Sequence, residues 1–110
     1  MKHNNLLSKV HLRVGTVMHV EDFPEADKPM YKLRIDFGPK LGIKEACSQI
    51  TNYPKETLLN MQILCMTQVP AMRIGSFTSE VIVCGCYHQN GSVILMIPAA
   101  EIPNGYSLST

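Results

Sequence analysis

The sequence has no tryptophan and few aromatic residues, three Phe and four Tyr among 110 residues. The volume of a hydrophobic core must therefore come mainly from Val, Ile, Leu and Met. Charged residues make up only 17% of the chain, against a usual share of about 25%. A surface with so few charges leaves apolar area exposed, which predicts that a partner subunit covers some of it.

The chain also lacks a strong excess of either charge, since its net charge is +1 and its pI is about 7.7. Proteins driven onto nucleic acid by bulk charge are usually much more basic, so any RNA binding must come from a local patch. No apolar run approaches membrane-spanning length, and residues 1–5 lack the layout of a secretory signal. We expect a cytoplasmic protein without membrane insertion, whose cysteines are reduced.

Motifs for catalysis and metal binding are missing as well. There is no Gly-x-Ser-x-Gly elbow and no glycine-rich phosphate loop followed by Lys-Ser/Thr. Cys84-Gly85-Cys86 lacks the spacing of a zinc knuckle. The sequence predicts a protein that is not an enzyme and binds no metal or cofactor. Cys84 and Cys86 are expected on one strand face within the core, where a free thiol behaves as a small apolar side chain.

The polar and apolar residues that are present alternate as in β-strands. This period-two pattern predicts strands over residues 12–20 and 31–37 and a weaker one over 43–50, in one domain spanning residues 1–110. In the first strand, the residues expected on one face are Leu12, Val14, Thr16, Met18 and Val20. Gly15 within this strand predicts a bend, as at a barrel corner.

The second half of the chain continues this strand pattern. Residues 62–69 predict a fourth strand buried on both faces, and residues 53–59 one or two helical turns with Pro54 first. Residues 81–87 and 92–97 flank Asn90-Gly91, which predicts a hairpin with a primed turn. Met61, Met66 and Met96 are expected in the core. The pattern alone predicts a small β-barrel or sandwich.

Three motifs carry a family resemblance. They are Arg13-x-Gly15, Pro24-Glu25-Ala26-Asp27-Lys28 and Arg73-x-Gly75-x-x-x-Ser79-Glu80. In this order they resemble the tRNA-binding OB-fold domain family and, within it, the stand-alone CsaA-like branch. The resemblance implies a five-stranded Greek-key OB barrel with a short helix before the fourth strand. It also implies a non-catalytic homodimeric chaperone for unfolded or export-bound polypeptides, or alternatively a structure-selective tRNA-binding module acting in trans.

Candidate binding residues follow from the resemblance and from residue type. Arg73 and Ser79 match positions that the family uses to hold tRNA, and the basic residues of an OB sheet face join them. The nucleic-acid candidates are Arg13, Lys32, Arg34, Lys44, Arg73 and Ser79. The peptide-binding candidates are Met30, Met72 and Phe77. The flexible side chains of the two methionines suit varied apolar partners.

Interpretations of the same residues that involve no bound ligand remain open. Lys32 and Arg34 would serve equally as solubilising charges, and Arg73 would fix its loop if it paired with Glu80. Met30 and Met72 would also suit a dimer seam. The apolar residues of segments 1–10 and 98–110 predict that both are dimer-forming extensions of the barrel.

Overall fold

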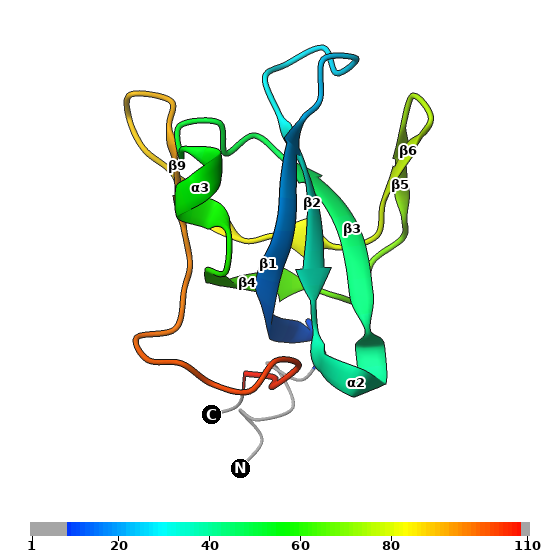
Figure 1. The fold of residues 1–110 in the computed structure, drawn as a ribbon, viewed down its shortest axis with the longest axis vertical. Helices are drawn as coiled ribbons and strands as arrows, with labels where there is room; N and C mark the ends of the chain where they lie inside the picture. The colour runs from blue at the N-terminus through cyan, green and yellow to red at the C-terminus, as the bar shows by residue number, and fades with distance from the viewer. Residues whose placement is uncertain (1–8, 109–110) are drawn as a thin grey trace.

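Five antiparallel strands form the main sheet of the structure, a computed structural model that describes residues 9–108 (Figure 1). They are β1 (Leu12–Asp22), β2 (Tyr31–Asp36), β3 (Ile43–Ser48), β4 (Gln62–Met66) and β7 (Ile82–Val83). Their order in the sheet is β3-β2-β1-β4-β7. The two outer strands approach each other, since the N–H of Glu80 donates to the carbonyl of Glu45 in β3 at 2.7 Å. The sheet is therefore a nearly closed barrel, as the OB fold requires.

Strand β2 follows the predicted alternation. Tyr31, Leu33 and Ile35 are buried, while Lys32 and Arg34 point to the outside of the barrel. The interior is filled by aliphatic side chains with few aromatic ones, as the composition predicts. The core includes Val17, Leu33, Ile35, Phe37, Ala46, Ile50, Leu58, Ile63, Cys65 and Val81.

Strand β1 changes partners along its length. It pairs with β4 from Leu12 to Thr16 and with β2 from Thr16 to Asp22. Gly15 lies beside this change, where a Cβ would stand 2.6 Å from Cγ2 of Ile35 and 2.8 Å from the Phe37 ring. Glycine is thus required by close packing at the corner of the barrel.

The predicted face of β1 is wrong at Val17 and Met18 but correct again at Val20, which packs against the core. The register shifts between Val17 and His19, so that Val17 is fully buried whereas Met18 is 48% exposed. An irregularity of this kind adds a residue to one strand, and here it returns Val20 to the core side, opposite Leu33.

Two short helices connect the strands. The predicted helix before the fourth strand is present as α3 (Lys55–Leu58), which buries Leu58 in the core. Pro54 is its N-cap residue and not its first helical residue. The helix α2 (Gly38–Leu41), which follows β2, was not predicted.

Strand β4 is shorter and less buried than predicted. It ends at Met66, and only Ile63 and Cys65 are buried, so the expectation of burial on both faces is wrong. Of the methionines expected in the core, Met61 is half-buried and packs against it, whereas Met66 is only half-buried and Met96 is exposed.

The predicted hairpin near the C-terminus is confirmed as β8 (Gly85–Tyr87) and β9 (Val93–Leu95). Its turn differs from the primed two-residue turn that was predicted. The N–H of His88 donates to the carbonyl of Ser92, which leaves a loop of Gln89, Asn90 and Gly91. Within this loop only Gly91 has a positive φ, as in three-residue hairpin loops that end in a left-handed residue.

A second hairpin lies where a loop was predicted. Strands β5 (Met72–Ile74) and β6 (Phe77–Ser79) pair across Gly75-Ser76, and Gly75 has a φ of 61°. Figure 1 shows this hairpin, the loop between β1 and β2, and the β8–β9 hairpin at one end of the barrel. Helix α2 and the C-terminal segment (red) lie at the other end.

The C-terminal segment belongs to the barrel over much of its length. Its backbone bonds to β1 on the edge that β2 does not reach: Gly105 N–H donates to Val14, and Val14 N–H donates to Tyr106. The side chain of Gln62 bonds both the N–H and the carbonyl of Ile102. Of the predicted dimer-forming extensions, residues 1–8 lie outside the described residues.

Candidate peptide-binding pocket

A pocket of about 330 Å³ lies between the β5–β6 hairpin and the barrel. It contains two of the three predicted peptide-binding residues, Met30 and Met72. All of its lining residues are uncharged: Met30, Cys47, Ser48, Gln49, Met72, Ile74, Ser79, Val81, Ile82, Val83, Gly85, Tyr87 and Val93. A lining without charge suits an apolar occupant, because an ion would lose its hydration there without gaining a counter-charge.

The register of the hairpin separates its two faces. Met72 pairs with Ser79 and Ile74 with Phe77, so these four side chains share the face toward the barrel. Arg73 pairs with Thr78 on the opposite face. Arg73 is exposed, and its Nε donates to the carbonyl of Gly75 at 3.3 Å. The hairpin thus presents apolar side chains to the pocket and an arginine to solvent.

Ser79 and Glu80 join the base of the hairpin to β3. Ser79 is only 7% exposed; its Oγ accepts from Cys47 N–H at 3.1 Å and donates to the Val81 carbonyl at 3.3 Å. A carboxylate oxygen of Glu80 accepts from Glu45 N–H at 2.9 Å. Within residues 9–108 Arg73 makes no ion pair, so the interpretation that it pairs with Glu80 is wrong.

Phe77 is attached to the barrel by an aromatic contact. Its ring packs edge-on against Phe23, with centroids 5.5 Å apart. The Nζ of Lys32 lies 4.8 Å from the Phe23 centroid and 5.5 Å from the Phe77 centroid. These three residues are called the aromatic clamp below. Phe77 thus lies beside the pocket rather than in its lining.

The six predicted nucleic-acid residues do not form one patch. Lys32 and Arg34 share the outer face of β2, but their cross-strand partners include Glu21 and Glu45. Lys44 pairs with the buried Ile35, so Lys44 lies at an inward-facing position of β3. A single continuous basic surface is therefore absent from this face of the described chain.

Arg13 lies at the opposite end of the barrel. Its Nη1 donates to the Gly105 carbonyl at 2.8 Å, which ties the C-terminal segment to β1. It lines a different pocket of about 730 Å³, together with Lys40 and Tyr106. Arg13 and Arg73 thus cannot serve one compact site.

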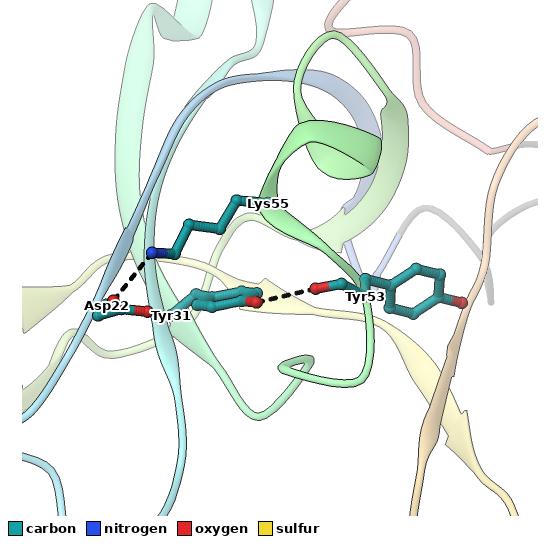
Figure 2. Close-up of polar contacts among 4 residues, drawn as sticks. All are labelled: Asp22, Tyr31, Tyr53 and Lys55. Atoms are coloured by element: carbon teal, nitrogen blue, oxygen red, sulfur yellow. Dashed lines mark hydrogen bonds and ion pairs between the residues drawn. The ribbon is translucent and has the colours of Figure 1, made fainter.

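A polar cluster that was not predicted from the sequence joins β1 and β2 to the segment around α3 (Figure 2). Tyr31 Oη donates to the Tyr53 carbonyl at 2.8 Å, and Lys55 pairs with Asp22 at 2.8 Å. The hydrogen bond with Asp22 raises the pKa of Lys55. The Tyr53 ring points away from Tyr31, and its hydroxyl oxygen accepts from Leu95 N–H in β9.

Asn52 completes the attachment of β9. Its carboxamide accepts from Val93 N–H and donates to the Val93 carbonyl. Because Val93 lines the pocket, Asn52 and Tyr53 fix one wall. The expectation of helical turns over residues 53–59 included Tyr53 but not Asn52, and it gave neither residue a role in holding another strand.

The cysteines differ in their environments. Cys65 is buried, which raises the pKa of its thiol, and partial burial also raises the pKa of Cys84. Cys86 is exposed, so its predicted core position is wrong. The reason is that Cys86 pairs with the exposed Ile94, on the face of the β8–β9 hairpin opposite to the buried Val93 and Leu95.

Metal-ligand clusters and membrane-spanning helices are both absent from residues 9–108. In that range no three His, Cys, Asp or Glu residues gather as metal ligands would. The same part of the chain has no helix that is long and apolar enough to cross a membrane.

Comparison with known proteins identifies the family. Residues 12–107 match the family described as "Putative tRNA binding domain". Together with the nearly closed five-stranded barrel, this match shows that the chain belongs to that family of tRNA-binding OB domains.

Within this family the chain is a homologue of the CsaA chaperones. Crystal structures of CsaA proteins from Picrophilus torridus and Bacillus anthracis are each 42% identical to it. Each match covers 96% of both chains, with TM-scores of 0.89 and 0.88. The methionine–tRNA ligase of Porphyromonas gingivalis is 34% identical over 98 residues, and the chain spans 14% of that protein's length.

The buried serine at the hairpin base provides a first test. Ser79→Ala removes the acceptor for Cys47 N–H, and an unsatisfied buried donor costs about 1–3 kcal/mol. We expect this loss in the free energy of unfolding, measured in urea. Ser76→Ala is the matched control, since Ser76 is exposed in the turn of the same hairpin. Equal stability of the two variants would contradict a structural role for Ser79.

Proposed function

We propose that this protein is a non-catalytic, homodimeric chaperone of the cytoplasm that binds apolar segments of unfolded or export-bound polypeptides. The observation that carries the proposal is the uncharged pocket between the β5–β6 hairpin and the barrel. The 42% identity to two CsaA chaperones over nearly the whole chain supports it.

The side chains of the pocket fit this role. Met72 is 55% exposed and Met30 is half-buried, so both are available to an occupant. Methionine side chains are unbranched and polarizable, and they adapt to apolar groups of different shape. A site of this kind selects for hydrophobicity and against charge, with little selection for a particular sequence.

Replacing a methionine of the pocket tests this proposal. Met72→Ser removes apolar contact area without disturbing a hydrogen bond, and burial of a methionine side chain is worth about 1.5–3 kcal/mol. We expect roughly ten-fold weaker binding of reduced, carboxymethylated α-lactalbumin, measured by fluorescence anisotropy, because an exposed site recovers only part of that energy.

Met18→Ser is the control for this experiment. Met18 is exposed to a similar degree but lies on β1, outside the pocket. The proposal predicts unchanged binding for this variant. Binding that weakens equally in both variants, or in neither, would argue against the pocket as the binding site.

Dimerisation is part of the proposal and is supported by apolar surface near the C-terminus. Ile94, Met96, Ile97 and Tyr106 are exposed. Met96, Ile97 and Tyr106 also line an apolar depression of about 360 Å³. A soluble monomer seldom leaves such residues together in contact with water. A second copy of the chain that covered them would form a two-fold interface.

A charge placed in this surface should dissociate the dimer. We expect the wild-type protein to sediment as a dimer that buries at least about 1,000 Å² in total. Ile97→Asp should shift it to monomer at micromolar concentration, whereas Ile43→Asp, an exposed isoleucine on β3, should not. A wild-type monomer would contradict the dimer, and a dimeric Ile97→Asp variant would place the seam elsewhere.

The second candidate function is structure-selective tRNA binding in trans, which the family match favours. Arg34 and Arg73 are exposed and have no ion-pair partner within residues 9–108. Guanidinium groups in this state are free to contact phosphates. Because the basic residues are dispersed, we expect such binding to be weak and strongly dependent on salt.

Arg73 tests the RNA hypothesis. Arg73→Ala should weaken binding of bulk tRNA and lower the slope of log K against log salt by about one phosphate contact. Its stability should be unchanged, since the side chain is exposed. Lys40→Ala, an exposed cation at the other end of the barrel, is the control. An unchanged salt slope in Arg73→Ala would exclude Arg73 from the RNA interface.

A further inference from the structure

The β5–β6 hairpin is attached to the barrel mainly through β6. Ser79 and Glu80 hold its base against β3. Phe77, next to the turn, holds the other end of β6 against Phe23 and Lys32. Met72 and Ile74 on β5 line the pocket, and β5 is paired to β6. The position of this pocket wall therefore depends on how β6 is held.

The two attachments have different consequences. They lie at opposite ends of a strand of three residues, about 7 Å apart. An attachment at the base alone would leave the hairpin free to pivot about Ser79. A second attachment at Phe77 fixes its tilt, and the tilt sets the distance of Met72 and Ile74 from the opposite wall.

We propose that Lys32 is a positioning residue: with Phe23 and Phe77 it forms a clamp that sets the tilt of the hairpin and thereby the affinity of the pocket. This inference rests on the proposed peptide-binding function for its second half and on geometry alone for its first. It assigns to Lys32 a role that is neither RNA binding nor solubility.

The geometry of the clamp supports a specific role for the charge. Phe23 is 4% exposed, so it is a fixed platform directly after β1. Lys32 Nζ lies within cation–π range of both rings, and the ring contact is edge-on. One ammonium therefore links the platform to Phe77 on the hairpin. Arg34, two residues along the same face, has no such contact among the described residues.

Three variants test the clamp. Lys32→Met keeps the apolar stem but removes the charge. Lys32→Arg keeps the positive charge and should therefore preserve the clamp. Arg34→Met is the matched control on the same strand face. Two readouts are needed: hydrogen exchange of the Ile74 and Phe77 amides beside the turn, and affinity for reduced, carboxymethylated α-lactalbumin.

We expect Lys32→Met to accelerate exchange in residues 72–79 relative to the barrel strands and to weaken polypeptide binding about three- to ten-fold. Lys32→Arg should behave as wild type in both readouts, and Arg34→Met should change neither. This pattern would distinguish positioning from general destabilisation, which would accelerate exchange in the barrel strands as well.

Other results would overturn the inference. Unchanged exchange at Ile74 and Phe77 in Lys32→Met would show that the charge does not hold the hairpin. Faster exchange with unchanged affinity would show that the tilt does not control binding. If the wild-type protein does not bind the polypeptide, the proposed function fails, while the exchange measurement still decides whether the clamp positions the hairpin.

Discussion

The arrangement of this protein depends on how the open edge of its sheet is closed. Strand β7 has only two residues and pairs with β4, so it cannot cover the edge of β3 with a full ladder. The unpaired groups of that edge are bonded instead by Glu80 and by the Ser79 hydroxyl. Because these residues end the β5–β6 hairpin, closure of the barrel also fixes the base of the hairpin and hence one wall of the pocket.

Elsewhere in the fold, side-chain amides bond backbone groups that have no neighbouring strand. Asn52 bonds both backbone groups of Val93, and Gln62 bonds both backbone groups of Ile102. In each case a carboxamide, which can donate and accept at once, takes the place of a neighbouring strand. A barrel of short strands can in this way fix irregular segments at both of its ends. These segments need no neighbouring strand and therefore remain available for binding or assembly.

The sequence predicted the elements whose pattern is local. Strand β2 was correct because Tyr31, Leu33 and Ile35 face one core throughout. The face of β1 was predicted wrongly at Val17 and Met18, because the register shift beside them depends on the partner strand. Of the candidate site, Met30 and Met72 were predicted and do line one pocket. The roles of Ser79 and Asn52 depend on contacts between distant segments, which local patterning does not report.

The two candidate functions fall on opposite faces of one hairpin. Met72 and Arg73 are neighbours in sequence, yet the strand period directs the first toward the uncharged pocket and the second toward solvent. A polypeptide in the pocket and a phosphate at Arg73 would therefore meet different surfaces of the same three-residue strand. Either ligand would affect the tilt of the hairpin. Binding on one face would therefore influence binding on the other. Any such coupling would pass through the attachments of β6, because β6 joins the hairpin to the barrel at both of its ends.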